Sequence, residues 1–463
     1  MRLDRQVIRA VSQFRDAEQY SFVVEYPPPL VRPRISETDI LSKSPSDSGS
    51  GNPPIEVYVH IPDCPYICDF CSFYKFSRLS EQERDRYVSA VQKEVDIYVE
   101  RSDLATRTVT SVFFGGGTPT RLSPDQLSRL LAHLAGKLRL SEDVEVTVES
   151  SPDTLDNEIL ESMLRGGVNR LSIGVQDFHD PVLAARHRGH TGQQAIDAYH
   201  RARTLGFENI NIDLIYRLPQ QTLAGWDQNL QVIRDLAPDY ATFYHLRKER
   251  RTSLGKKKEA CFPTKEEAME MYLRALETLV GMNYLQISPN QFAAPKKEFR
   301  QQEHKWHRGS ELLGLGASAY SWFNGFAYRN VGRFGTNMRK DLTTYLSTIE
   351  SGHLAVESGE RPTAQEQMRR FALFGLKTSG INRPSGGIDK QLFLERFGVS
   401  LEAILGDAIQ DLKTKGLVEE DAQTLRLTLG GLLVAEEVAT LLYSSAMNNR
   451  LKKVKNTFGR DGL

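Results

Sequence analysis

The chain has 463 residues, of which 40% are apolar and 25% are charged, as in ordinary globular proteins long enough for two or three domains. Lys plus Arg and Asp plus Glu number 59 each, so net charge gives no reason to expect nucleic acid or an anionic membrane as a partner. No run of about 18 apolar residues is present, and the charged first residues lack the apolar core of a signal peptide. We therefore expect a cytoplasmic protein that binds neither nucleic acid nor membrane.

Residues 1–54 differ in composition and in hydrophobic pattern from the rest of the chain. Val7, Ile8, Val11 and Phe14 give a short N-terminal helix an apolar face. Residues 26–54 are rich in Pro, Ser and Gly, which is typical of a flexible or extended linker. We therefore expect a helix and a linker before the first domain.

Strand and helix patterns alternate from residue 55 to about residue 360. The predicted helices cover residues 80–100, 123–138, 154–166, 191–205, 222–236 and 264–281, and the predicted strands cover residues 56–61, 109–115, 144–150, 169–176, 209–216 and 239–246. Alternation with nearly continuous apolar strands favours an α/β fold with a parallel sheet covered by helices. Six units are too few for a closed eight-stranded barrel, so we expect a six-fold partial barrel with its chemistry at the carboxyl ends of the strands.

The remainder of the chain has a different pattern. Residues 361–445 are mainly helical, with a short hairpin-like LRLTLGG piece, and predict a smaller α-rich domain resembling a winged helix. Residues 446–463 carry several Lys and Arg residues and are predicted to be a solvated basic tail.

Three of the four cysteines lie within eight positions, as Cys64, Cys68 and Cys71, whereas Cys261 is remote. This arrangement is no disulfide framework, so a metal site in a reducing compartment is the better interpretation. A structural zinc ion needs four ligands, usually from two C-x2-C pairs, and no second pair exists. An iron–sulfur cluster with three protein thiolates leaves one iron open for another ligand and fits better. Reduced bystander thiols are the third alternative.

The C-x3-C-x2-C spacing with an aromatic residue, Phe70, before the last cysteine resembles the radical S-adenosylmethionine (SAM) superfamily. The stretches YVHIP, GGGTPT, NRLSIGVQDF, NIDLIYRLPQQT and LLGLGASAYS resemble the HemN family, the relatives of oxygen-independent coproporphyrinogen III oxidase. The resemblance covers residues 55 to 435. It implies a [4Fe–4S] cluster on the three cysteines and SAM on the open iron. It also implies a small-molecule substrate and an external electron donor of the flavodoxin or ferredoxin type.

The resemblance also implies roles for individual residues. Backbone N–H groups of the glycine run 115–117 can approach a ligand closely, because glycine has no side chain. An Arg suits a carboxylate and an Asp suits ribose hydroxyls, although each polar residue taken alone is also compatible with a structural role. Phe70 either stacks on an adenine or packs in the protein. The positions matched to the first SAM are Tyr58, Gly116, Glu149 and Tyr320, and those matched to a second SAM are Gly117, Thr118, Gln176, Arg188 and Asp213.

One departure from the oxidase pattern directs the functional prediction. The oxidases resembled here carry a further cysteine after the triad, whereas this chain has Ser72 and Phe73 in CSFYKF. We therefore predict a methylase or cyclopropanase that uses two SAM molecules and transfers a SAM-derived carbon to an sp2 carbon of a natural product. Coproporphyrinogen oxidation is the alternative, and haem binding without catalysis is the second alternative. Residues 247–258 are predicted to be a solvated basic loop rather than a pocket for an acidic substrate, with Cys261 as a bystander thiol beside it.

Overall fold

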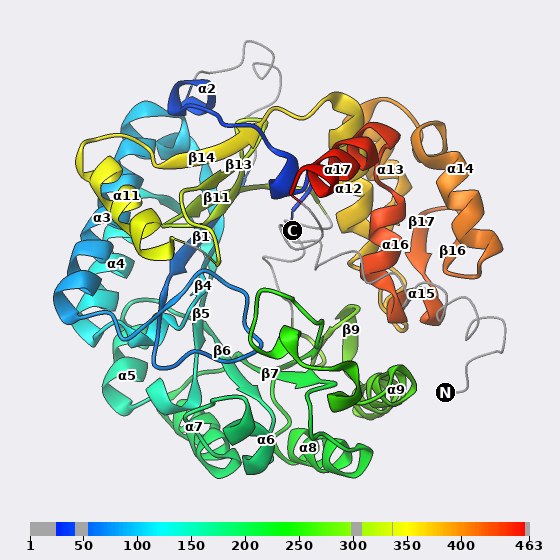
Figure 1. Ribbon diagram of the computed structural model, residues 1–463, viewed down its shortest axis with the longest axis horizontal. Helices are drawn as coiled ribbons and strands as arrows, with labels where there is room; N and C mark the ends of the chain where they lie inside the picture. Colours follow the sequence, from blue (N-terminus) through cyan, green and yellow to red (C-terminus); the bar gives the residue numbers. More distant parts are fainter. Residues whose placement is uncertain (1–24, 42–53, 298–307, 336, 459–463) are drawn as a thin grey trace.

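The computed structural model describes residues 25–41, 54–297, 308–335 and 337–458. The apolar face predicted around Val7 lies outside these residues. Figure 1 shows a strongly curved sheet, an outer layer of helices and a second unit on the right, built from the carboxyl-terminal residues. The protein is therefore an α/β barrel-like domain joined to a smaller helical domain.

The centre of the sheet consists of parallel strands. They are β1 (Ile55–Ile61), β4 (Thr108–Gly116), β5 (Arg139–Ser150), β6 (Arg170–Gln176), β7 (Ile210–Tyr216) and β8 (Tyr240–His245), paired in this order, and β11 (Glu311–Leu315) is parallel to β1 on its other side. Antiparallel strands extend both edges: β12 (Tyr320–Phe323), β13 (Phe326–Asn330) and β14 (Val356–Glu360) beyond β11, and β10 (Gln291–Ala293) and β9 (Leu285–Ser288) beyond β8. The prediction of a six-fold partial barrel is thus confirmed, with a seventh parallel strand added.

Helices connect the strands and cover the outside of the sheet (Figure 1). They are α3 (Glu81–Arg101), α4 (Pro124–Lys137), α5 (Asn157–Arg165), α7 (Gly192–Leu205), α8 (Leu223–Leu236) and α9 (Lys265–Gly281), together with the unpredicted α6 (Asp180–Ala185) and α11 (Met338–Glu350). Several begin at a capping box, in which the side chain before the helix and the third helical residue satisfy each other's backbone N–H groups, as at Ser80, Ser123, Thr191 and Thr264. These caps explain why the predicted helix starts agree closely with the structure.

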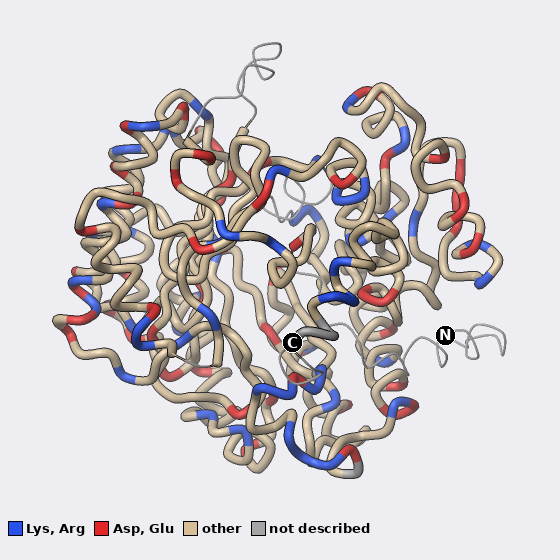
Figure 2. Tube along the Cα trace, turned by 45° about the horizontal axis from the view of Figure 1, so that its top comes forward, with Lys and Arg blue, Asp and Glu red and all other residues tan. Residues whose placement is uncertain are grey.

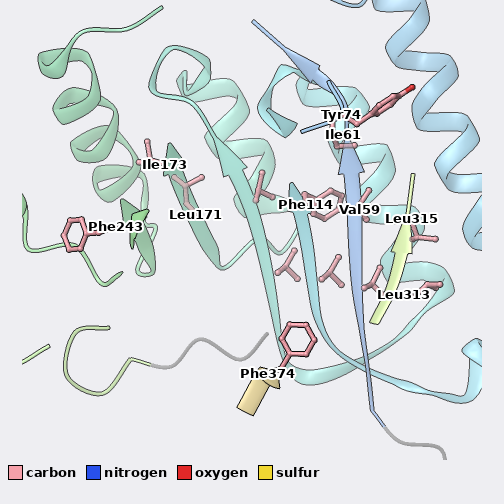
Figure 3. Packing of buried hydrophobic residues seen from close by; sticks show 14 of the residues in the cluster. Val59, Ile61, Tyr74, Phe114, Leu171, Ile173, Phe243, Leu313, Leu315 and Phe374 are labelled. Carbon is pink, nitrogen blue, oxygen red and sulfur yellow. The ribbon is translucent and has the colours of Figure 1, made fainter. Parts of the chain in front are cut away.

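The barrel strands have two chemically different faces. Val59 and Ile61 of β1 and Phe114 of β4 are buried in the apolar layer between sheet and helices, as Figure 3 shows. Because successive side chains of a strand point to opposite faces, Tyr58 and His60 point into the barrel. The interior therefore receives polar side chains while the outer layer supplies the hydrophobic core.

The smaller domain has the topology of a winged helix. Its order is α12 (Ala364–Leu376), β15 (Ile388–Asp389), α13 (Lys390–Phe397), α14 (Leu401–Thr414), β16 (Val418–Glu420) and β17 (Thr424–Leu427), with the strands arranged β15-β17-β16. The short helices α15 (Leu429–Leu433) and α16 (Ala435–Leu441) follow. This arrangement agrees with the fold predicted for residues 361–445.

The smaller domain contacts both ends of the open sheet. At the β9 end, Asn382 donates to the Tyr284 carbonyl at 2.8 Å and Arg383 donates to the Ile287 carbonyl at 2.9 Å. Towards the other end, the guanidinium of Arg370 on α12 lies 4.2 Å from the ring centre of Trp322 on β12, two strands in from the edge strand β14. The domain therefore spans the gap between the two edges of the partial barrel.

The predicted solvated tail is wrong for residues 445–458, which form helix α17 (Ser445–Phe458). Met447 and Leu451 of α17 are buried, because their i, i+4 spacing places both on one face of the helix. Arg450 donates to Glu360 at 2.9 Å and to the Val31 carbonyl at 2.8 Å. The basic residues between the apolar ones concealed this packed face in the sequence.

The predicted linker is likewise wrong for residues 25–41, which carry the 3-10 turn Pro29–Val31 and helix α2 (Glu37–Leu41). Glu25 and Arg32 are buried and form an ion pair at 3.7 Å. Tyr26 is fully buried and hydrogen-bonds to Glu366 of α12. The segment is therefore held between the two domains by side chains that a Pro-rich composition does not reveal.

Charged residues of both signs are interspersed along the chain trace in Figure 2, in agreement with the balanced composition. Within the described residues, no helix combines the length and apolar character needed to cross a membrane.

Candidate active site

The cysteine loop starts where β1 ends, at the carboxyl edge of the parallel sheet. β2 (Asp63–Cys64) pairs with β3 (Phe76–Ser77) and closes the base of the loop. Gly117 donates to the Ile61 carbonyl at 2.8 Å and Thr118 donates to the Asp63 carbonyl at 2.7 Å. A Cβ on Gly117 would lie 2.6 Å from the Asp63 carbonyl oxygen. The glycine run at the end of β4 therefore lies directly against the start of the cysteine loop.

The three predicted cluster ligands share this loop. Cys64 is buried, and Cys68 and Cys71 are half-buried. Burial raises the pKa of the Cys64 thiol to about 12 and also raises the pKa of Cys68, so their thiolates need a bound cation to be stable. In the described part of the chain, no three His, Cys, Asp or Glu side chains are close enough to hold a single metal ion. Three thiols on one loop nevertheless suit a cluster, which has several metal atoms.

Cys261 is separate from the triad. It is an exposed thiol in the 3-10 turn Glu259–Cys261. Its place after strand β8 gives it no part in the loop that carries the other three cysteines.

The residues matched to the first SAM gather inside the barrel. The Gly116 N–H donates to Glu149 at 3.1 Å, and the Tyr58 hydroxyl lies 3.2 Å from Nδ1 of His60. Gly116 has φ of +107°, and a Cβ there would lie 2.3 Å from the His60 ring, so glycine is required. Burial, reinforced by Asp213, raises the pKa of Glu149 to about 7. A nearby ammonium group would lower this pKa and favour the ionised carboxylate.

Tyr320 begins β12 and is half-buried. Its backbone lies against Gly314, the β11 residue that pairs with Tyr58 on β1. Burial, and then Glu149 and Tyr320, raises the pKa of Tyr58. The four residues predicted for the first SAM thus face the same interior volume.

Arg188 is the central residue of the second predicted set. Its guanidinium lies 3.5 Å from the Cys68 sulfur, donates to the Ser151 hydroxyl at 3.1 Å and hydrogen-bonds to the Gly174 carbonyl. Its Nε is buried and has no hydrogen-bond partner in the described part of the chain. A buried donor with no acceptor fits a site that receives an anionic group such as a carboxylate.

Gln176 and Asp213 lie on the strands beside Arg188. Gln176 ends β6 with φ of +73°, a conformation that is costly for a non-glycine residue. Asp213 on β7 accepts hydrogen bonds from Ser172 at 2.9 Å and Asn211 at 2.8 Å, and burial raises its pKa. Thr118, the remaining member, donates to the Cys64 sulfur at 3.7 Å. Thr118 and Arg188 therefore contact cysteines of the loop, whereas Gln176 and Asp213 lie on the adjoining strands β6 and β7.

Phe70 packs beside a small apolar cluster that includes Ile215, Leu218 and Leu254. Its neighbour Asp69 forms a buried ion pair with Arg186 at 3.1 Å and accepts a hydrogen bond from the Leu254 N–H. The structure therefore gives Phe70 a packing role, and stacking on an adenine stays a prediction.

The basic loop 247–258 differs from the solvated loop predicted. Arg247 pairs with Glu437 at 3.0 Å, Lys248 with Glu259 at 3.3 Å and Lys257 with Asp69 at 3.9 Å. Leu254 and Gly255 are buried. The loop is thus tied to its surroundings by ion pairs and by packing against the cysteine loop.

Sequence reasoning missed Tyr66 and Ser151. The Tyr66 hydroxyl lies 2.8 Å from the Ser151 hydroxyl, and the Arg188 guanidinium lies 5.2 Å from the centre of the Tyr66 ring. The position of Tyr66 between two cysteines was the available signal. Ser151 directly follows the VES motif, but nothing in the sequence indicates its contact with Arg188.

The sequence also gave no indication of a hydrogen-bond network on the helix side of β1. Glu94 of α3 accepts hydrogen bonds from the Gly316 N–H at 2.8 Å, Tyr345 at 2.7 Å and Asn330 at 2.7 Å. A Cβ on Gly316 would lie 2.6 Å from the His60 carbonyl oxygen. Glu94 therefore anchors the loop that leads from β11 to Tyr320 against the strand that carries Tyr58 and His60.

Comparisons with known proteins agree with this geometry. A family model described as Radical SAM superfamily matches residues 58–233, and one described as HemN C-terminal domain matches residues 363–434. The heme chaperone HemW of Bacillus subtilis is 31% identical over 388 residues, which cover 82% of this chain and 97% of that protein. This chain belongs to the HemN-like family of radical SAM proteins.

Other HemN-like proteins are similar over a comparable length. The oxygen-independent coproporphyrinogen III oxidase of Pseudomonas aeruginosa is 28% identical, covering 87% of this chain and 89% of that protein. The solved structure of coproporphyrinogen III oxidase (HemN) from Escherichia coli superimposes with a TM-score of 0.77 at 25% identity, covering 92% of this chain and 98% of that one. As a radical SAM protein of this family, the chain uses a [4Fe–4S] cluster and SAM.

The predicted methylase or cyclopropanase activity is wrong by these comparisons. The relatives that cover most of the chain are named heme chaperone or coproporphyrinogen III oxidase, and neither name indicates carbon transfer. The prediction depended on Phe73 in place of a cysteine, and one substitution in a loop is weaker support than similarity along nearly the whole chain.

Proposed function

We propose that this HemN-like protein is an oxygen-independent oxidase of the coproporphyrinogen III type, converting propionate side chains of a tetrapyrrole to vinyl groups. The observation that carries the proposal is the buried Arg188 guanidinium beside Cys68. A carboxylate-binding arginine beside a cluster ligand would serve the carboxylate of a second SAM, which supports catalysis rather than haem carriage alone. The similarity to the Escherichia coli oxidase over 92% of this chain supports the same conclusion.

The chain's own residues would prepare the site in distinct ways. Cys64, Cys68 and Cys71 would hold the cluster, which when bound supplies the electron that cleaves SAM to a 5′-deoxyadenosyl radical. Glu149 and the Gly116 N–H would orient the first SAM.

For the second SAM, Arg188 would bind the carboxylate, and Asp213, already fixed by Ser172 and Asn211, would receive ribose hydroxyls. Gln176, Gly117 and Thr118 would complete this second position. An external flavodoxin- or ferredoxin-like electron donor remains part of the proposal.

Haem binding without catalysis is the second candidate. The 31% identical relative is named a heme chaperone. Phe73, which takes the place of the further cysteine of the oxidases, has 60% of its surface exposed. An exposed aromatic ring beside the cluster loop suits contact with a flat apolar ligand such as a porphyrin.

Anaerobic turnover with coproporphyrinogen III, SAM and a low-potential reductant separates the two candidates. If the protein is an oxidase, vinyl groups, carbon dioxide and 5′-deoxyadenosine should form in proportion to one another. The matched control is Cys261→Ala, which should retain activity because Cys261 is apart from the triad. Absence of product from cluster-loaded protein, together with a saturable Soret band on haem titration, would replace the oxidase by the haem-binding protein.

A further inference from the structure

A small pocket lies between the barrel and the winged-helix domain, far from the cysteine loop. Trp322 in its wall pairs with Leu312, which in turn pairs with Glu56 near the start of β1. The cysteine loop follows the other end of β1, about 17 Å away at the rise of a β-strand. Figure 3 shows Phe374 of α12 at this same amino-terminal end of the strands. The pocket is lined by Gly309, Trp322, Gln367, Arg370, Phe371, Arg396 and Phe397.

Arg370 forms the polar floor of this pocket. Only 3% of its surface is exposed, and its Nε and Nη2 atoms have no hydrogen-bond partner among the described residues. These two N–H groups lie on the same edge of the guanidinium, the edge that can donate to two oxygens of a carboxylate or phosphate at once. The guanidinium carbon lies over two aromatic rings, 4.2 Å from the ring centre of Trp322 and 5.0 Å from that of Phe374. The ring contacts fix the orientation of the guanidinium and leave its hydrogen-bonding edge unused.

Arg396 adds a second positive charge at the more exposed rim. It donates to the Arg308 carbonyl at 2.9 Å and lies 5.6 Å from the Phe371 ring centre. The carboxylates within electrostatic reach of Arg370, Glu25 and Glu311, are each paired with a different arginine. Within the part of the chain that the structure describes, the charges around the pocket therefore sum to a positive value.

We propose that this pocket binds a small oxyanion, a carboxylate or a phosphate, held by two hydrogen bonds from Arg370 and secured by Arg396. The enclosed part of the pocket, about 20 Å³, has room for one or two oxygen atoms, so the anion would place its oxygens against Arg370 and the rest of the group in the open mouth. This space is too small for a tetrapyrrole. Arg370 belongs to the winged-helix domain and Trp322 to the barrel, so the anion binds where the two domains meet. The proposal does not depend on the function of the cysteine site.

Isothermal titration of the anaerobically purified full chain tests the proposal, with inorganic phosphate in one arm and acetate in the other at constant ionic strength. We expect one saturable site for at least one of the anions, and the stronger arm assigns the class. Arg370→Lys keeps the charge but loses the paired donors, so affinity should fall by about 10-fold or more. Arg396→Gln should weaken binding by roughly 3- to 10-fold, because one nearby charge is lost. Arg426→Gln, at an arginine of the same domain paired with Glu419, is the matched control and should bind like the unaltered chain.

Two outcomes would overturn the proposal. The first is the absence of saturable binding up to ~50 mM of either anion, which would mean that water alone satisfies Arg370. The second is unchanged affinity in Arg396→Gln. Arg396→Gln decides the question even if Arg370→Lys does not fold. Arg396 lies at the exposed rim of the pocket, so its replacement should leave the fold intact.

Discussion

Replacing Glu94 by glutamine should remove a pH dependence of stability that the fold creates. Burial raises the pKa of Glu94 from its ordinary value of 4.5 to about 7, even though three donors face the carboxylate. Between pH 4.5 and 7 the folded chain therefore retains a proton that the unfolded chain has released. The contribution of Glu94 to the free energy of unfolding is complete below pH 4.5 and is lost as the pH rises through 7.

The size of this effect follows from the shift in pKa. Each pKa unit corresponds to about 1.4 kcal/mol, so ionisation of Glu94 should cost the folded state about 3 kcal/mol between pH 5 and pH 8. Urea denaturation at several pH values, followed by tryptophan fluorescence, measures this cost as the difference between the unaltered chain and Glu94→Gln. Glu149 titrates in the same range, and the subtraction removes its contribution because it is present in both proteins.

Glu350→Gln is the matched control. Glu350 is exposed on the neighbouring helix α11, and its hydrogen bond to Arg86 lowers its pKa. Its titration therefore lies below pH 5 and should leave the pH 5–8 slope unchanged. Equal slopes for the unaltered chain and Glu94→Gln would refute the reasoning, because they would show that Glu94 is ionised in the folded protein throughout this range.

Three further predictions concern the cluster, the second SAM and the carboxyl-terminal helix. Cys68→Ala should lose most of the bound iron whereas Cys261→Ala should keep it, and metal analysis of anaerobically purified protein checks both; stoichiometric zinc without iron in the unaltered chain would contradict the cluster. Arg188→Met should weaken the second SAM by about 1.5–3 kcal/mol, the worth of a charge-assisted hydrogen bond, so equilibrium binding should fall from two sites towards one, and an unchanged two-site isotherm would exclude the assignment. Leu451→Ala should lower the free energy of unfolding by about 2–3 kcal/mol in urea denaturation, as expected for a truncated buried leucine, and a loss below 0.5 kcal/mol would mean that α17 contributes little to stability.

The sequence was informative where structure is locally determined. Helix starts at Ser123 and Thr191 follow from capping residues next to periodic apolar positions, and the cysteine spacing identifies the ligand loop. Glu149, at the end of a predicted strand, lies near the carboxyl end of β5 in the structure. These features depend on neighbours within a few residues or on the general geometry of parallel sheets.

Contacts between distant parts of the chain could not be predicted in this way. Tyr26 is buried by Glu366, which is 340 residues away, and α17 hides an apolar face among lysines that packs beside Val31. Glu94 is another example, because its partners come from positions 316–345. Composition describes such segments as polar, and only the tertiary structure supplies the partners that bury them.

The winged-helix domain that spans the open sheet has a mechanical consequence. An incomplete barrel has two free edges, and their separation sets how wide its side opening is. Here the domain is attached to the β9 end by hydrogen bonds from Asn382 and Arg383, and towards the β14 end by the contact of Arg370 with Trp322 on β12. The domain therefore holds the two ends of the sheet at a set distance. A small rotation of the domain would widen or narrow the side opening of the barrel without altering any residue at the cysteine loop.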